Sequence, residues 1–325
     1  MEPVASTVRE MAEDSSFGHA PVMLTEIGEV FAPIVAGTLV DATLGGGGHA
    51  SSLLAAHPAL HLVGLDQDDA AIAAATEQLA PFADRVRIVR TRFDRLSATL
   101  SDLGIDKVAG VLFDLGVSSA QLDRADRGFS YRADGPLDMR MDRRAERTAA
   151  DLVNGLEAGE LADVLRRFGD ERFAGRIARA LVAARPITST GQLADVVRGA
   201  IPAAGRRRGG DPAKRSFQAL RIAVNDELVV LGDALDQAID ALAPGGRLAV
   251  LAYHSGEDRI VKARLRAGER GGCTCPPQLP CVCGAEPELT LLWRGAHTPT
   301  AGEVADNRRA ASARLRAAER LGVAA

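Results

Sequence analysis

The chain has 325 residues, of which 46% are hydrophobic and 25% are charged, and its formal net charge is −4. This balance is typical of a globular protein, and the length is enough for one extensive core or two. The acidic total gives little general attraction to nucleic acid. Because no apolar run is long enough to span a bilayer and the N-terminus lacks a secretory core, we expect a cytoplasmic protein. Residues 1–18 are polar and aperiodic and predict a disordered leader.

The first informative segment is an apolar run that ends at Asp41 and predicts a buried parallel strand. Four glycines follow, from Gly45 to Gly48, and then a helical stretch over about 49–57. Glycines at a helix N-terminus let the backbone approach a nucleotide-like ligand without Cβ clashes. The segment therefore predicts a cofactor site.

The identity of that cofactor depends on two acids. The next predicted strand ends in Asp66, where doubly wound folds hydrogen-bond a ribose diol. The glycines fit the dinucleotide pattern Gly-x-Gly-x-x-Gly/Ala, so a nicotinamide cofactor is one interpretation, and a merely tight turn is another. Asp41 lies four residues before the first glycine, and Asp-x-x-x-Gly-x-Gly resembles the first motif of class I methyltransferases, which bind S-adenosylmethionine. A pyrophosphate would disfavour such a carboxylate.

Strand-like and helical runs alternate along most of the chain. The expected strands are 38–41, 61–66, 85–90, 108–114 and 247–252, and the expected helices are about 49–57, 69–80, 94–103 and 217–242. Strands separated by helices of this length imply βαβ units and a parallel sheet. Residues 123–215 are helical in pattern and too numerous for a simple crossover. We predict that they form an all-helical insertion that recognises substrate at the carboxyl end of the sheet.

Asp114, at the end of the fourth predicted strand, is the candidate for chemistry. In enzymes that methylate exocyclic amino groups, an acid or amide here accepts the amino hydrogens and makes the nitrogen lone pair available. The two prolines and the aromatic residue that usually follow are missing, so a base would stack elsewhere, for example on Phe129 or Tyr131. Equally, Asp114 could be a cap or turn residue, and the two rings could be packing residues.

Several basic and acidic side chains leave two interpretations open. Arg206, Arg207 and Arg208 form a basic, glycine-rich loop, and a second group of arginines extends from Arg294 to Arg320. Either group could bind phosphates or belong to a solvated loop or helix face. After the fifth predicted strand, acids and a histidine could orient a base or only the backbone. These are His254, Glu257 and Asp258.

All the cysteines lie within residues 273–283, as Cys273-x-Cys275 and Cys281-x-Cys283. This is not the framework of a secreted disulfide protein. Four thiolates brought together by a hairpin would suit a tetrahedral, structural zinc ion. Cys-x-Cys is a less common ligand pair than Cys-x-x-Cys, so the sequence alone assigns no metal ligand.

Three long stretches, DLGVSSAQLD, RGFSYRADGPLDMRMD and SFQALRIAVNDEL, resemble the ribosomal RNA small subunit methyltransferase H family. His19 with the following Ala-Pro-Val-Met and residues 253–259 add to the resemblance, which covers nearly everything after residue 17. It implies S-adenosylmethionine-dependent methylation of the exocyclic amino group, N(4), of one cytosine in 16S rRNA near the ribosomal P site. The small ribosomal subunit would be the partner, with neither membrane nor DNA. The chain departs from the family's pattern at Ala252, Tyr253 and Gly256, where Ser, Phe and Leu are more usual.

The resemblance also implies a set of cofactor contacts, with Asp114 as the catalytic candidate. The contacts fall on Gly47, Gly48, His49, Asp66, Phe93, Asp114 and Gln121. From the residues alone, Phe93 could face an adenine ring or pack in the core, and His49 could cap a helix. Gln121 rests on the resemblance alone.

The expected fold is therefore α/β, with a class I, Rossmann-like S-adenosylmethionine-dependent methyltransferase sheet over residues 19–122 and 216–325. The inserted helical substrate-recognition domain is expected over 123–215. Two other functions stay open at this point: a nicotinamide dehydrogenase, and a methyltransferase-like RNA-binding protein that assists ribosome assembly without turnover.

Overall fold

The computed structural model describes residues 21–203, 211–273, 275–276 and 282–322. The expected leader, His19, Cys281 and the arginines at 206–208 lie outside the described residues. The chain forms two compact units, one from the residues before Val117 and after Val229, the other from Val117–Val229. Among the described residues, no helix is both long and apolar enough to cross a membrane.

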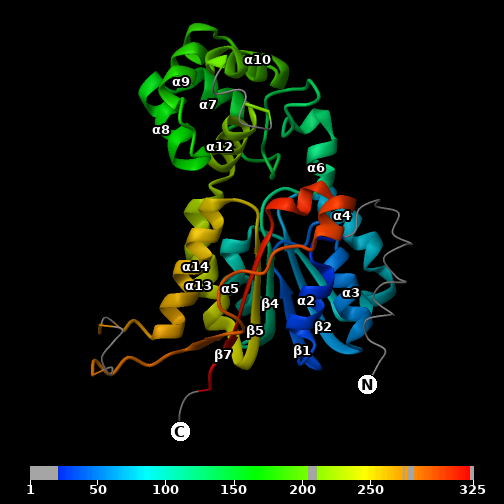
Figure 1. The fold of residues 1–325 in the computed structure, drawn as a ribbon. Coiled ribbons are helices and arrows are strands. Elements are labelled where there is room, and N and C mark those ends of the chain that lie inside the picture. Colours follow the sequence, from blue (N-terminus) through cyan, green and yellow to red (C-terminus); the bar gives the residue numbers. More distant parts are fainter. Residues whose placement is uncertain (1–20, 204–210, 274, 277–281, 323–325) are drawn as a thin grey trace. The chain divides into compact units, whose positions relative to one another are not determined.

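The first unit is built on a seven-stranded sheet (Figure 1) with the order β3-β2-β1-β4-β5-β7-β6. Its strands are β1 (Ala36–Asp41), β2 (Ala59–Asp66), β3 (Val86–Arg90), β4 (Val108–Asp114), β5 (Leu242–Ala252), β6 (Leu289–Leu291) and β7 (Arg314–Arg320). The first five strands pair in parallel, whereas β7 is antiparallel to both β5 and β6. The chain order reverses between β1 and β4, and open α/β sheets bind their ligands at the carboxyl ends beside such a switch point.

Helices flank this sheet and close its core. They are α2 (Leu24–Phe31), α3 (Gly48–Ala56), α4 (Asp69–Gln78), α5 (Leu96–Asp102), α14 (Ser255–Arg270) and α15 (Ala301–Asp306), together with α13 (Glu227–Ala241), which begins at the unit boundary. The central strands are apolar on both faces because helices cover both. Leu39, Leu62 and Leu112, on three neighbouring strands, are at most 1% exposed.

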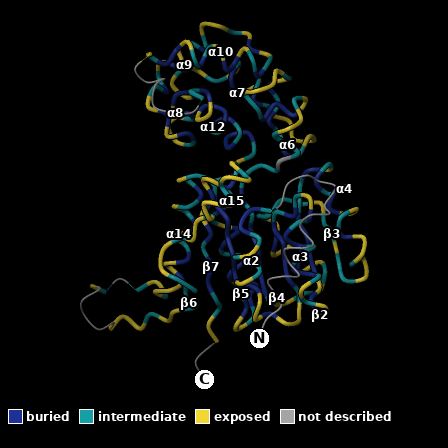
Figure 2. The backbone as a smooth tube through the Cα atoms, turned by 45° about the vertical axis from the view of Figure 1, so that its right-hand side comes forward, coloured by how far each residue is buried: buried dark blue, intermediate teal, exposed yellow. Residues whose placement is uncertain are grey.

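The second unit is helical in the residues that the structure describes. It contains α6 (Ser119–Asp123), α7 (Ala149–Gly155), α8 (Ala158–Gly169), α9 (Ala174–Ala183), α10 (Thr190–Ala200) and α12 (Lys214–Asn225). Leu165, Ile177 and Leu193 lie at 0% exposure in a core of its own. Figure 2 shows buried residues inside each unit.

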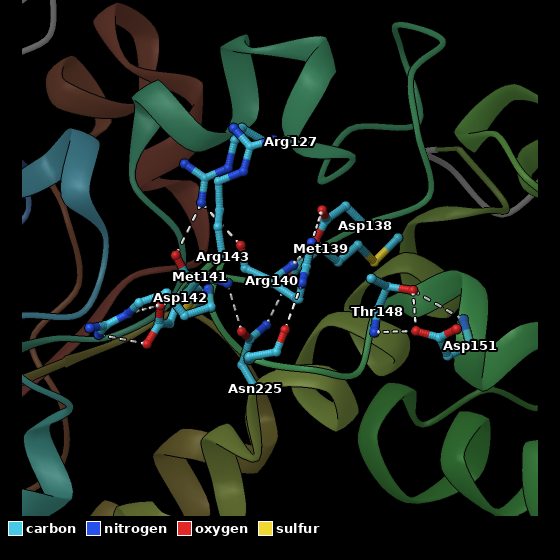
Figure 3. A network of polar contacts seen from close by, with 12 residues as sticks. Arg127, Asp138, Met139, Arg140, Met141, Asp142, Arg143, Thr148, Asp151 and Asn225 are labelled. Atoms are coloured by element: carbon cyan, nitrogen blue, oxygen red, sulfur yellow. Dashed lines mark hydrogen bonds and ion pairs between the residues drawn. The ribbon is translucent and has the colours of Figure 1, made fainter.

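The segment before α7, which carries the RGFSYRADGPLDMRMD stretch, has little regular structure and is held by polar contacts (Figure 3). The buried guanidinium of Arg127 donates to the carbonyls of Arg140 and Met141 at 3.0 and 3.1 Å. Asn225 of α12 donates to Met139 O and accepts from Met141 N, both at 2.8 Å. Several residues of this stretch are therefore needed to fold the helical unit itself, whatever else they do.

Three expectations about elements differ from the structure. The single helix predicted over 217–242 is two helices, because Asp226 adopts a left-handed φ of +54° between α12 and α13. The apolar stripe continues through this one-residue break, so periodicity could not reveal it. The helical unit is longer than 123–215 because α12 packs on α8, where the backbone of Arg215 lies against Gly169.

The third difference concerns the C-terminal arginines. Residues 314–320 form the strand β7 and not a helix face. Two of the arginines make ion pairs within the unit: Arg316 with Asp258, and Arg320 with Glu288.

Candidate cofactor and catalytic site

Three carboxyl groups end three neighbouring strands of the sheet. Asp41 ends β1, Asp66 ends β2 on one side of it, and Asp114 ends β4 on the other. The pKa of Asp41 is raised to about 7, mainly by burial and also by the charges of Asp114 and Asp66, against the opposing effect of the hydrogen bond from the Thr43 amide. Burial also raises the pKa of Asp66 and of Asp114. A set of desolvated carboxylates favours a ligand that brings positive charge and disfavours a pyrophosphate.

Asp66 fixes the glycine turn that follows β1. Its Oδ2 accepts a hydrogen bond from the Gly45 amide at 2.8 Å, and its Oδ1 accepts one from the Asp68 amide at 2.9 Å. These backbone donors oppose the effect of burial on the pKa of Asp66. The carboxylate thus joins the ends of β1 and β2 at the place where a ribose diol is expected.

Glycine is required by the geometry at the start of α3. Gly47 is the N-cap with a φ of +81°, and a Cβ there would lie 3.3 Å from Leu79. At Gly48 a Cβ would lie 2.6 Å from the ring of Pro21. Close packing against Leu79 and Pro21 therefore requires glycine at both positions. The turn leads into the N-terminus of α3, a place that favours polar, nucleotide-like ligands.

Asp114 is held from three directions. The Tyr253 hydroxyl donates to its Oδ1 at 2.7 Å, the Nδ1 of His49 lies 3.7 Å from its Oδ2, and its own amide donates to Thr43 Oγ1 at 2.5 Å. His49 is itself anchored, because its Nε2 lies 2.9 Å from the Val22 carbonyl. The Asp114 side chain is 29% exposed, so it combines a fixed orientation with access to a ligand.

The residues after β5 have a structural role. His254 and Glu257 form a reciprocal cap of α14: His254 Nδ1 accepts from the Gly256 and Glu257 amides, and Glu257 Oε2 accepts from the Tyr253 and His254 amides. Asp258 pairs with Arg316 of β7 at 2.7 Å. Of the two interpretations of these residues, the structure favours orientation of the backbone.

The remaining predicted residues are more dispersed. Phe93 is half-buried, with its ring edge-on to Phe113 of β4 at 5.9 Å between centroids. Gln121 belongs to the other unit, where it forms a capping box with Ser118 at the start of α6. Phe129 and Tyr131 pack in the core of that unit, as the packing interpretation requires. The structure thus brings together Gly47, Gly48, His49, Asp66 and Asp114 around the carboxyl ends of β1, β2 and β4.

Two residues of this site had no assigned role in the sequence. From the sequence, Tyr253 was noted only as a departure from the family's pattern, and Thr43 was not noted at all. The available signal was position, since Tyr253 directly follows β5, the neighbour of β4. Its contact with Asp114 spans 139 residues of sequence, so no local pattern could reveal it.

The site fits S-adenosylmethionine. The desolvated carboxylates complement an ammonium or sulfonium charge, Asp66 lies where a ribose diol is expected, and the glycine turn leaves room for close approach. The parallel sheet with its antiparallel β7, the glycine turn and the three acids define a class I S-adenosylmethionine-dependent methyltransferase.

Residues 16–321 match the MraW methylase family, and the chain belongs to this family. It is 56% identical to the ribosomal RNA small subunit methyltransferase H of Thermobifida fusca, over 93% of each chain. It is 54% identical to the protein of the same name from Saccharopolyspora erythraea, also over 93% of each. A solved structure, a putative rRNA methylase from Clostridium thermocellum, covers 93% of this chain and 100% of its own at 15% identity with a TM-score of 0.44, too low to bear on the assignment.

Proposed function

We propose that the chain methylates the N(4) amino group of one cytosine in 16S rRNA, near the P site of the small ribosomal subunit, in the cytoplasm. The single observation that carries the chemistry is the environment of Asp114, a carboxylate that is fixed by the chain and still accessible. The names of the relatives support ribosomal RNA of the small subunit as the substrate. The choice of cytosine N(4) rests on the family resemblance and on the chemistry of an acceptor at this place.

In this proposal Asp66 holds the ribose of the cofactor, and the glycine turn with Gly47, Gly48 and His49 surrounds its methionine end. Phe93 and Gln121 complete the contacts. Bound S-adenosylmethionine supplies a methyl group on a positively charged sulfur. Hydrogen bonds to an ionised acceptor are the stronger ones, so Asp66 contributes most when it is charged.

Asp114 has two tasks in this proposal. Its carboxylate accepts an amino hydrogen of cytosine, which draws the nitrogen lone pair out of conjugation with the ring. Once the nitrogen gains a methyl group its proton is strongly acidic, so no stronger base than a carboxylate is needed. Because burial raises the pKa of Asp114, this side chain is well suited to receive that proton. Orientation of the reacting atoms supplies most of the catalysis.

A cationic groove on the first unit supports RNA as the substrate. A cavity of about 390 Å³ is lined by Lys262, Arg266 and Arg270 of α14 and by Arg294, all exposed, next to Trp293. Among the described residues that line this cavity, Glu269 is the single acid. Clustered cations beside an aromatic ring suit a phosphate backbone and an unpaired base. The chain therefore has a local basic surface although its overall charge is −4.

The direct test is to map the product. Small subunits from cells that lack this gene are incubated with the protein and S-adenosylmethionine, and their RNA is digested and analysed by mass spectrometry. We expect one amino-methylated cytidine, with the assembled subunit a better substrate than naked RNA, since the target base must be unpaired or flipped out. A ring-carbon methyl, or a modified adenine or guanine, would contradict the proposal. Absence of any turnover would favour the RNA-binding alternative, and binding of NADH would favour the dehydrogenase.

The role of Asp114 is tested by a matched pair of substitutions. Asp114→Ala is expected to reduce turnover at saturating cofactor and RNA by at least a hundredfold, while Asp114→Asn, which keeps one acceptor oxygen, retains more activity. The control is Asp106→Asn, an exposed acid just before β4, at the opposite end of the strand. Turnover of Asp114→Ala near that of the control would remove Asp114 from the chemistry.

A further inference from the structure

We propose that the loop between α14 and β6 binds one structural zinc ion through the thiolates of Cys273, Cys275 and Cys283. The spacing of these cysteines in the sequence is compatible with a zinc site but does not by itself establish one. The structure adds a second, independent observation, because it brings three sulfur atoms together from both ends of the loop.

The distances among the sulfurs match a metal site. All three Sγ atoms lie within 4.8 Å of one another, and those of Cys273 and Cys283 are 3.6 Å apart. Two thiolates bound to one tetrahedral zinc at about 2.3 Å have their sulfurs about 3.8 Å apart. The observed 3.6 Å is close to this value and far longer than a disulfide bond of about 2.05 Å.

The backbone brings these cysteines together. The helix α14 ends at two left-handed glycines, Gly271 and Gly272, and the Cys273 amide then donates to the Arg270 carbonyl at 3.0 Å. The returning limb is tied to the same helix, because the Glu288 amide donates to the Gly268 carbonyl at 2.9 Å. A Cβ at Gly271 would lie 2.2 Å from the backbone of Glu286, so the two limbs touch at this point. The loop therefore leaves and rejoins the sheet unit through a narrow base.

Apolar burial does not hold the described part of this loop in place. Of the residues between α14 and β6 that the structure describes, none is buried, and Val282 beside Cys283 is 89% exposed. Ordering a long irregular loop costs conformational entropy that burial does not offset here. A bound metal that cross-links both limbs supplies the missing free energy, as in other small metal-organised segments.

The ligand chemistry selects the ion. Thiolate sulfur is a soft donor that binds zinc well and calcium or magnesium poorly. A structural zinc takes four ligands, and Cys281, which lies outside the described residues, is not needed for the inference from the other three. The three predicted ligands belong to a segment that contains none of the predicted cofactor residues. The zinc is thus expected to order the loop and to take no part in methyl transfer.

The test measures metal content on the full-length protein. Protein expressed in zinc-supplemented medium is desalted and analysed for metals. We expect about one zinc per chain in the wild type and in Val282→Ala, the control within the same loop, and less than a tenth of that in Cys273→Ser/Cys283→Ser. Binding of S-adenosylmethionine by the serine variant shows that its sheet unit is folded.

Two further readouts separate a built site from chance binding. Thiols of the purified protein should react slowly with a disulfide reagent and rapidly after a chelator is added, and limited proteolysis should cut the loop faster in the chelated protein. Replacing zinc with cobalt should give the intense visible absorption of a tetrahedral thiolate site. Equal zinc content in the serine variant, rapid thiol reaction before chelation, or iron in place of zinc would overturn the proposal.

Discussion

At the scale of single residues, the site is controlled by how each carboxyl group is desolvated and by what donates to it. Asp114 shows this most directly, because burial raises its pKa while His49 and the Tyr253 hydroxyl lower it. The same hydroxyl fixes the direction of one carboxylate oxygen. Tyr253 is therefore a positioning residue for Asp114, at a place where the family resemblance leads one to expect phenylalanine.

We expect Tyr253→Phe to lower methyl transfer about tenfold, because a hydrogen bond to a charged group contributes about 1.5–3 kcal/mol. Without the hydroxyl the pKa of Asp114 rises, so the acidic limb of the pH–rate profile should move to higher pH. Tyr131→Phe is the control, since that ring packs on Phe217 in the helical unit. Rates measured across pH for both variants would disprove the role of Tyr253 if the two acidic limbs coincide.

Asp41 gives a prediction about stability. Its pKa is about 7 in the folded protein against an ordinary 3.8, so between these values the folded state binds more protons than the unfolded state. Stability from this group is then fully present below pH 4 and is lost as the pH rises towards 7, at up to about 1.4 kcal/mol per pH unit. Asp41→Asn cannot ionise, and its amide oxygen can still accept from Thr43. We expect the variant to gain stability over the wild type between pH 5 and pH 8.

The measurement is urea unfolding followed by the fluorescence of Trp293, the only tryptophan of the chain, which lies in the sheet unit. The difference in unfolding free energy between variant and wild type should grow as the pH rises from 5 to about 7 and then level off. A difference that stays constant from pH 5 to pH 8 would mean that Asp41 is ionised throughout this range and that burial does not raise its pKa.

At the scale of elements, the sequence predicts most of the sheet and less of what surrounds it. The strand ends at Asp41, Asp66 and Asp114 agree with the structure, because long apolar runs ended by an acid have few other interpretations. The break at Asp226 and the antiparallel strand β7 were not predicted. A one-residue change of φ leaves the apolar stripe intact, and β7 carries arginines whose partners, such as Asp258, are distant in sequence.

The candidate site was predictable to the extent that it depends on strand ends and glycines. The cap of α14 was not, although His254 and Glu257 have the spacing of a capping box, because histidine is not among the usual N-cap residues. The contact of Tyr253 with Asp114 depends on the pairing of β4 with β5, which sequence periodicity does not specify. Contacts of this kind can be identified only when the three-dimensional fold is known.

The cap of α14 supports a prediction at this scale. Glu257 is 2% exposed, and its Oε2 accepts from two backbone amides, including that of Tyr253 at 2.7 Å. Glu257→Ala should reduce the unfolding free energy of the sheet unit by about 2–4 kcal/mol, because buried donors lose their acceptor. It should also slow methyl transfer by displacing Tyr253. Glu269→Ala, an exposed glutamate on the same helix, is the control. Equal unfolding midpoints by Trp293 fluorescence would contradict the role of the cap.

At the scale of the whole molecule, the chain is two units with separate cores. Leu165 lies in the core of the helical unit and Leu62 in that of the sheet unit, and both are at most 1% exposed. The residues of the proposed chemistry, Asp66 and Asp114, belong to the sheet unit. Separate cores imply that each unit can lose its structure without the other, so unfolding of the whole chain need not be a single transition.

We therefore expect the two cores to respond independently. Leu165→Ala should destabilise the helical unit by about 2–5 kcal/mol, and Leu62→Ala should do the same to the sheet unit. Trp293 fluorescence follows the sheet unit, whereas far-ultraviolet circular dichroism follows both. Leu165→Ala should move part of the dichroism transition to lower urea and leave the fluorescence midpoint in place, and Leu62→Ala should lower the fluorescence midpoint. S-adenosylmethionine should still raise the fluorescence midpoint of Leu165→Ala, because all of its proposed contacts except Gln121 belong to the sheet unit and a ligand stabilises the state that binds it. If Leu165→Ala moves both signals together by the same amount, the units unfold as one and the division into independent cores is wrong.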